Sequence, residues 1–233
     1  MKADAARTLA RVARAGYKQV EFAGYFGHSA KDLRRMLDDN GLTAPSAHIQ
    51  MADLGGGWES ALDAANTIGH EYLVCGWIDE PERTVAGYKK IAARFNGAAE
   101  KSVKHGIMVG YHNYSYDFKK IDGEIPYEIL LRECDPKKVV MEMDVFWVRA
   151  GGGDPIAYLD QNPGRFRMLH AKDMGPSPKN EMEDVGKGVV DWPAILEHGQ
   201  NAGVKYVFVE HDDPADPWAS IRGSYLYLHA LDF

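Results

Sequence analysis

Residues 139–152 read VVMEMDVFWVRAGG, and residues 165–174 read RFRMLHAKDM. In both stretches a β-rich apolar run ends in polar residues: Asp144 closes the first run, and His170 and Lys172 close the second. Because successive side chains of a strand alternate between its two faces, His170 and Lys172 point the same way. If the two strands are parallel neighbours, a carboxylate and an imidazole meet at their carboxyl ends. The two stretches therefore predict both a parallel sheet and a polar site at one edge of it.

The same local unit recurs along the chain: a helix, a glycine at its end, and then a β-rich run. Residues 13–22 (ARAGYKQVEF) and 201–212 (NAGVKYVFVEHD) are two examples. A glycine just past a helix takes the left-handed conformation that ends the helix at little cost. Strands are expected near 18–23, 43–49, 71–76, 107–113, 138–144, 166–171 and 205–210. Helices are expected near 3–15, 29–40, 57–68, 82–105, 124–133, 153–162, 192–202 and 216–230.

Strands that alternate with helices pair in parallel through right-handed crossovers, which predicts an α/β fold. The length of 233 residues suits one (β/α)8 TIM barrel, and we expect residues 1–233 to form a single domain of this kind. The chain opens on a helix, so we expect the first barrel strand to be lacking in this chain. An open sheet, or a strand supplied by another chain, would explain the same pattern. Unpaired sheet edges must be covered, and pairing with a second copy would give a homodimer.

The composition is that of an ordinary soluble globular protein, with 45% hydrophobic and 26% charged residues. The formal net charge of -7 argues against a nucleic-acid partner, because binding to phosphate backbones needs a basic surface. No apolar run is long enough to span a membrane, and the start of the chain lacks the features of a signal peptide. Cys75 and Cys134 lie far apart without metal-type spacing, so we expect free thiols and a cytoplasmic protein.

In a barrel the carboxyl ends of the strands converge on one mouth, where chemistry is found. Three of these ends carry Asp144, His170 and Glu210, and carboxylates with an imidazole are ligands of hard to borderline divalent cations. We therefore predict that these three residues hold a metal ion. Glu142 lies two residues before Asp144, and two interpretations stay open for it: support of a metal ligand, or a partner for a buried basic residue.

Other strand ends carry residues whose roles stay open. His112 and Asp117 each offer a fourth ligand or a proton carrier, and the sequence does not separate the two roles. Trp147 either caps the core or stacks on a sugar face, and the same holds for Trp77. Two further polar residues are either structural or contact a substrate, namely Glu21 and His48.

This set of residues suits one class of reaction. A divalent ion that binds a carbonyl and an adjacent hydroxyl lowers the pKa of the C–H bond between them and stabilises the enediolate. Glu210 would be ligand and base, Lys172 the electrophile, and His112 or Asp117 the second acid or base. This predicts a keto-sugar isomerase or epimerase. The alternatives are a lyase that acts on an inosose or a 3-keto-glycoside, and a non-catalytic barrel that binds a sugar.

The chain also resembles a known family over residues 5–231. The resemblance is to the sugar phosphate isomerase/epimerase superfamily of xylose isomerase-like TIM barrels. It is carried by VEFAGYFG, YHNYSYDF, MEMDVFWVRAGGGDPIAYL, PGRFRMLHAKDM, VGKGVVDW and VFVEHD.

The resemblance implies a divalent ion, manganese first and otherwise magnesium, cobalt or zinc, held by two glutamates, an aspartate and a histidine. It assigns Asp144, His170 and Glu210 to three of these four ligands. It also assigns Lys187, in the sequence Gly-Lys-Gly, to a loop that closes over the substrate. The chain departs from the family pattern at the first glutamate, and Asp117 is the residue that we predict as the fourth ligand.

Overall fold

The computed structural model describes residues 4–231, so the predicted helix 3–15 begins one residue outside them. The chain divides into two compact units, each with its own buried core. The first unit consists of Met1–His112 and Lys120–Val140, and the second of Asn113–Lys119 and Met141–Phe233.

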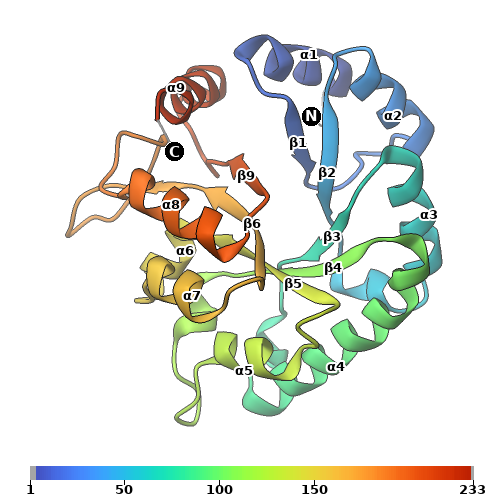
Figure 1. The fold of residues 1–233 in the computed structure, drawn as a ribbon, viewed down its shortest axis with the longest axis vertical. Coiled ribbons are helices and arrows are strands. Elements are labelled where there is room, and N and C mark those ends of the chain that lie inside the picture. The colour runs from blue at the N-terminus through green and yellow to red at the C-terminus, as the bar shows by residue number, and fades with distance from the viewer. Residues whose placement is uncertain (1–3, 232–233) are drawn as a thin grey trace. The chain divides into compact units, whose positions relative to one another are not determined.

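In the first unit, four strands pair in the order of the chain, and every pairing is parallel. The helices that precede and follow these strands lie along one side of them (Figure 1). Gly16 and Gly69 end the helices α1 and α3 with left-handed φ angles of 115° and 94°, as the repeated glycines predict. The strands are β1 (Gln19–Phe22), β2 (Thr43–His48), β3 (Tyr72–Cys75) and β4 (Met108–His112). The α-helices are α1 (Ala5–Ala15), α2 (Ala30–Asp38), α3 (Trp58–Ile68), α4 (Val85–Ser102) and α5 (Pro126–Glu133). The 3₁₀ turns are η1 (Met51–Leu54), η2 (Glu80–Glu82) and η3 (Val103–His105).

In the second unit, three strands are parallel neighbours, and β5 is buried along its whole length. Four of its six residues are apolar, as expected for a strand covered on both faces, and the two acids, Glu142 and Asp144, stand in its carboxyl half. The strands are β5 (Val139–Asp144, whose first two residues belong to the first unit), β6 (Phe166–Ala171) and β9 (Tyr206–Val209). The helices are η4 (Ser115–Phe118), α6 (Val145–Ala150), α7 (Pro155–Gln161), α8 (Trp192–Ala202) and α9 (Pro217–His229). A short antiparallel hairpin joins β7 (Asp173–Met174) and β8 (Met182–Glu183).

The predicted fold class is confirmed: seven parallel strands alternate with helices, and in residues 4–231 the helix α1 precedes the first strand. All seven predicted strands and all eight predicted helices are present. Helix α6 was not predicted, because VFWVRA is rich in β-branched and aromatic residues and follows a strand directly. That residues 1–233 form a single domain stays a prediction.

Asp173 anchors the segment that connects β6 to α8. Its carboxylate is fully buried and accepts hydrogen bonds from the backbone N–H of Met174, Gly186 and Val190, at 2.8, 2.9 and 3.2 Å. The indole Nε1 of Trp192 donates a fourth bond at 2.8 Å. Four donors on one carboxylate fix a segment that would otherwise be an irregular loop.

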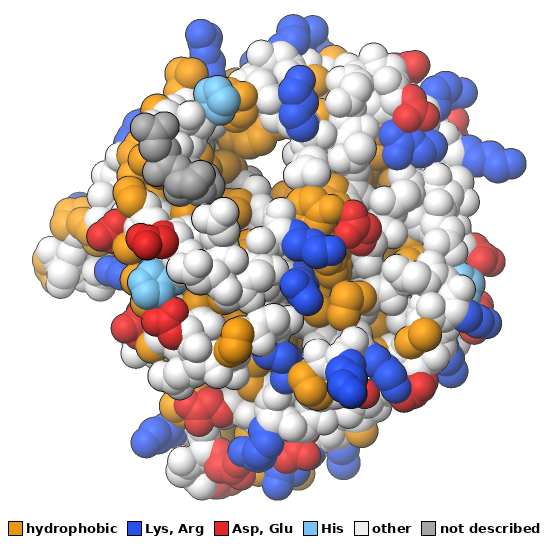
Figure 2. Space-filling view, in the orientation of Figure 1, with side chains coloured by type: hydrophobic (Ala, Val, Ile, Leu, Met, Phe, Trp, Pro, Cys, Tyr) orange, Lys and Arg blue, Asp and Glu red, His pale blue; other side chains and the backbone are white. Residues whose placement is uncertain are grey.

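No helix in the described part of the chain is long and apolar enough to cross a membrane. On the face drawn in Figure 2, acidic and basic side chains are scattered among uncharged ones.

Candidate functional site

The sheet register of the second unit brings the predicted ligands to neighbouring positions. Asp144, the last residue of β5, lies opposite His170 of β6. Glu210 follows β9 directly, and its N–H donates to the carbonyl of Ala171 at 3.1 Å. Three side chains therefore stand at the carboxyl ends of three adjacent parallel strands.

These side chains are within bonding reach of one another. Nδ1 of His170 lies 2.7 Å from Oε2 of Glu210 and 4.0 Å from Oδ2 of Asp144. The ligand-type atoms of the three residues all lie within 4.8 Å of one another. Asp144 and His170 are buried, and Glu210 is half-buried. Their assignment as metal ligands stays a prediction.

The two oxygens of the Asp144 carboxylate have different roles. Oδ1 accepts the backbone N–H of Trp147 at 2.9 Å and so caps α6, which leaves Oδ2 directed at the site. The backbone of Asp144 is held on both sides by the amide of Asn113, whose Oδ1 accepts the Asp144 N–H at 3.0 Å. Nδ2 of Asn113 donates to the Asp144 carbonyl at 3.2 Å. The position of this aspartate is therefore fixed by three hydrogen bonds.

The imidazole of His170 lies between two carboxylates. Its Nε2 is 3.4 Å from Oε1 of the fully buried Glu142, on the side of the ring away from Glu210. With a cation bound, a proton on Nε2 would face Glu142 and leave the Nδ1 lone pair for the cation. Of the two interpretations of Glu142, the geometry favours support of His170.

Lys172 introduces a positive charge among these carboxylates. Its Nζ lies 3.0 Å from Oδ2 of Asp144, 2.9 Å from Oε2 of Glu210 and 2.8 Å from Oδ1 of Asp212. Burial acts to lower the pKa of Lys172, but the carboxylates of Asp144, Glu210 and Asp212 outweigh it, so the pKa lies above its ordinary value. The side chain is only 2% exposed, and it stays an ammonium at every physiological pH.

The pKa of Glu210 is shifted in the opposite direction. Burial acts to raise its pKa, but the ion pairs with His170 and Lys172 outweigh it and hold the pKa well below its ordinary range. The carboxylate is therefore ionised at neutral pH. Proton abstraction favours a base whose pKa is raised, whereas these contacts lower the pKa of Glu210.

Aromatic side chains form one wall of the site. The Trp147 ring centroid lies 5.6 Å from Nζ of Lys172 and 5.8 Å from the ring of Tyr114. Tyr114 in turn stacks on Tyr116 at 5.6 Å. Burial first, and then the charge of Glu210, raise the pKa of Tyr114. Trp147 thus faces the charged cluster, as a residue that stacks on a sugar would.

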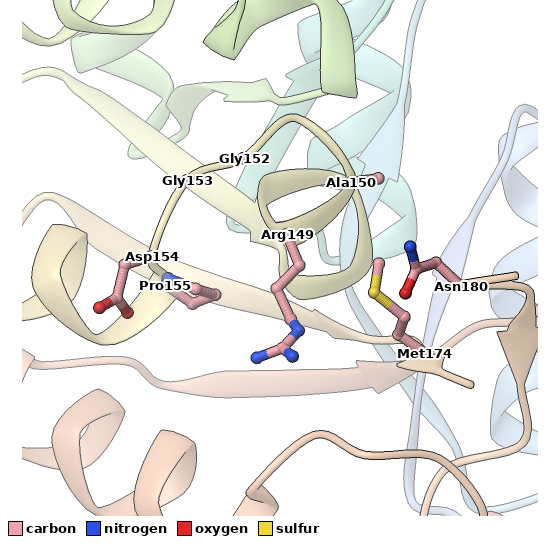
Figure 3. A pocket seen from close by; sticks show the side chains of 8 residues that line it. All are labelled: Arg149, Ala150, Gly152, Gly153, Asp154, Pro155, Met174 and Asn180. Carbon is pink, nitrogen blue, oxygen red and sulfur yellow. The ribbon is translucent and has the colours of Figure 1, made fainter. Parts of the chain in front are cut away.

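A cavity of ≈ 440 Å³ is lined by α6, the glycines after it and the β7–β8 hairpin (Figure 3). Arg149 reaches into it, two residues after Trp147 along α6. Met174 and Asn180 line it from the hairpin. The cavity has room for part of a sugar-sized ligand.

Two predicted residues of the second unit are engaged elsewhere. Asp117 is fully buried, and its Oδ2 accepts the backbone N–H of Tyr114 at 2.8 Å, which caps the turn η4. Lys187 is exposed and pairs with Oδ2 of Asp184 at 2.7 Å. Neither residue belongs to the group formed by Asp144, His170 and Glu210. Their predicted roles, as fourth ligand and as substrate contact, stay untested by this geometry.

The remaining predicted residues lie in the first unit. Oε2 of Glu21 is 3.2 Å from Nε2 of His48, whose ring lies 5.1 Å from that of His112. His112 directly precedes Asn113, the residue that clamps Asp144. Trp77 is exposed, donates from Nε1 to Asp79 at 3.1 Å and carries the Arg83 guanidinium over its ring. It therefore does not cap the core, contrary to one of its two interpretations.

The donor set of the second unit fits a divalent cation. Two carboxylates and an imidazole nitrogen converge on one point, and a third carboxylate supports the opposite ring nitrogen. This arrangement is typical of sites for manganese, zinc and related ions. Two further residues of the site, Asn113 and Asp212, follow strand ends in the sequence, and their partners are visible only in the structure.

Similarity to known proteins covers nearly the whole chain. A model of the xylose isomerase-like TIM barrel family matches residues 9–225. A solved sugar phosphate isomerase/epimerase from Parabacteroides distasonis is 27% identical, with a TM-score of 0.86 over 98% of this chain and 88% of that one. An inosose dehydratase from Lacticaseibacillus casei is 22% identical over an alignment of 240 residues including gaps, which covers 86% of this chain and 80% of the dehydratase. The IOLI protein, solved with a zinc atom, shares the fold at 17% identity and a TM-score of 0.74, over 96% of this chain and 90% of its own.

Proposed function

Because the chain belongs to the xylose isomerase-like TIM barrel family, we propose that it is a metal-dependent isomerase or epimerase of a keto sugar or a close derivative. The observation that carries the proposal is the convergence of Asp144, His170, Glu210 and Lys172 at the carboxyl ends of three parallel strands. Carboxylates, an imidazole and an ammonium at one point are what proton transfer next to a carbonyl requires.

Asp144, His170 and Glu210 would hold the divalent cation, with manganese as the first expectation and magnesium, cobalt or zinc as the others. When bound, such a cation supplies polarisation of the substrate carbonyl and stabilises the enediolate oxygens. Asp117 remains the proposed fourth ligand. Glu142 supports this role of His170, because its carboxylate lies against the ring nitrogen that faces away from Glu210.

The protein's own residues divide the proton transfer between them. Glu210 is the proposed base, because it is an ionised carboxylate beside the other proposed ligands. Lys172 would stabilise the negative charge that develops on the substrate oxygen, because its buried ammonium lies beside the proposed ligands. His112, or else Asp117, is the proposed second acid or base.

The substrate would lie against the aromatic wall. Trp147 offers an apolar ring face of the kind on which sugar rings stack, next to the charge that would act on the carbonyl. Three further residues remain proposed substrate contacts, namely Glu21, His48 and Lys187.

The proposal is tested by hydrogen exchange at carbon. A panel of keto sugars is incubated with the protein and manganese in D₂O, and ¹H NMR follows the C–H next to the carbonyl. Deuterium should enter at that carbon with the wild type and not with Glu210→Gln. Glu197→Gln, an exposed residue of α8, is the matched control and should exchange normally. Exchange that persists in Glu210→Gln would remove Glu210 from the role of base.

A second candidate is elimination of water from an inosose. The observation that favours it is the similarity to the inosose dehydratase of Lacticaseibacillus casei. Elimination begins with the same proton abstraction but breaks a C–O bond, whereas epimerisation keeps it. Mass spectrometry of the product decides between them, because only elimination removes one molecule of water.

We also expect a cytoplasmic protein that acts on a small carbohydrate. Two free buried cysteines, Cys75 and Cys134, are consistent with a reducing compartment. A homodimer remains the expected assembly, and the mass in solution, measured by light scattering, would test it.

A further inference from the structure

We infer that Lys172 competes with a divalent cation for Asp144 and Glu210, and that Asp212 is the positioning residue that draws the ammonium aside. The inference rests on the proposed metal site and concerns how that site is loaded. It makes Lys172 and Asp212 the residues that set the affinity for the metal.

The ammonium lies on the same oxygens that the cation would use. Oε2 of Glu210, which lies 2.7 Å from Nδ1 of His170, is also 2.9 Å from Nζ of Lys172. Oδ2 of Asp144 is 3.0 Å from the same Nζ, while the other oxygen of that carboxylate is engaged in capping α6. Each acid therefore presents to Lys172 the oxygen that it would present to a metal ion.

Two cations cannot share these oxygens without strong repulsion. A metal ion bound by a carboxylate sits about 2.1 Å from the oxygen, which would bring it close to an ammonium on that same atom. A divalent ion and an ammonium this close repel strongly, the more so because Lys172 is buried. Binding of a divalent ion thus requires Nζ of Lys172 to move away from Asp144 and Glu210.

The structure offers Lys172 one further carboxylate. Lys172 is almost completely buried, so its charge needs a partner within the protein. Oδ1 of Asp212 already lies 2.8 Å from Nζ, and this side chain is 45% exposed, which gives it freedom to follow the ammonium. The Trp147 ring, 5.6 Å from Nζ, stabilises the charge on another side.

Asp212 is in turn positioned by the hairpin. Its backbone N–H donates to Sδ of Met182 at 3.2 Å, and Met182 belongs to β8, which pairs with β7. β7 begins at Asp173, whose carboxylate anchors the whole segment. Asp212, whose carboxylate receives the ammonium of Lys172, is thus connected through the hairpin to the anchored segment at Asp173.

A double-mutant cycle on metal affinity tests the inference, with Mn²⁺ or Co²⁺ alone as the ligand. Affinity is measured by competition with a fluorescent chelator, for wild type, Lys172→Met, Asp212→Asn and the double variant. Lys172→Met should bind the metal about tenfold more tightly, because a competing charge is gone. Asp212→Asn should bind about tenfold more weakly, because Lys172 then stays on the ligands. The double variant should match Lys172→Met.

The cycle separates this inference from simpler electrostatics. If Asp212 acts only through its own charge, its replacement weakens binding equally in the Lys172→Met background, and the inference is overturned. Weaker binding by Lys172→Met overturns it as well, since Lys172 would then build the site rather than compete for it. Near-UV circular dichroism verifies folding, and Lys172→Gln serves if the methionine variant fails to fold. A wild type that binds no cation refutes the proposed function itself, before the cycle is begun.

Discussion

Nδ1 of His170 and Oε2 of Glu210 lie 2.7 Å apart, so two predicted ligands from neighbouring strand ends are joined by a direct hydrogen bond. On its other side the same ring meets Glu142, a carboxylate with no exposure to solvent. The ring orientation is therefore determined by the protein before any ligand arrives. Preorganisation of this kind is what makes a metal site selective and strong.

Replacement of the supporting carboxylate should weaken metal binding. We expect Glu142→Gln to lower the affinity for Mn²⁺ by about tenfold or more, because the His170 ring loses the charge that favours a proton on Nε2. Chelator competition measures the change, with Glu197→Gln as the exposed control. An unchanged affinity would mean that Glu142 only fills space beside His170.

Asp173 should matter for stability. Asp173→Asn removes the charge that accepts four N–H donors and turns an NH₂ group toward at least one of them. We expect a loss of about 3 kcal/mol in the free energy of unfolding, measured by urea denaturation. Asp213→Asn, at an exposed loop position, is the control and should change little. The variant should also be cut faster by proteases between residues 175 and 190, and equal resistance would contradict the role of Asp173 as the anchor.

His70 should make the stability depend on pH. It is buried, and its Nδ1 lies 2.6 Å from the carbonyl oxygen of Ala44. Burial, only partly offset by the bond to Ala44, lowers the pKa of His70 below its ordinary value. Between the folded pKa and about 6.5 the unfolded chain binds more protons, so stability falls as the pH falls through that range.

Urea denaturation at pH 7.5 and 5.5 tests this prediction for the wild type and His70→Asn. The wild type should lose more stability on acidification than the variant, because only the wild type must keep a buried imidazole neutral. Equal losses in the two proteins would show that other groups cause the acid sensitivity.

Of the predicted substrate contacts, Lys187 has the least structural support, because it is exposed and forms an ion pair with Asp184. If the resemblance assigns it correctly, Lys187→Ala should raise the KM several-fold and leave kcat and the melting temperature nearly unchanged. A KM equal to that of the wild type would remove Lys187 from the substrate site.

The sequence predicted the elements well, because glycine at the ends of α1, α3 and α8 and an apolar run after each helix are local signals. The convergence of Asp144, His170 and Glu210 also followed from local position, since each stands at the end of a strand. The partners Asn113 and Asp212 did not follow, because their side-chain directions depend on contacts between loops. The local signal for helix α6 is Asp144, which ends strand β5 and also caps the helix that follows.

The measurement that tests the central claim most directly is the metal content of the purified protein. After incubation with Mn²⁺ and removal of free ions, elemental analysis should find one ion per chain in the wild type. His170→Ala and Asp144→Asn should each retain far less. A wild type without retained metal, or variants that hold as much as the wild type, would contradict the claim that these side chains share one cation.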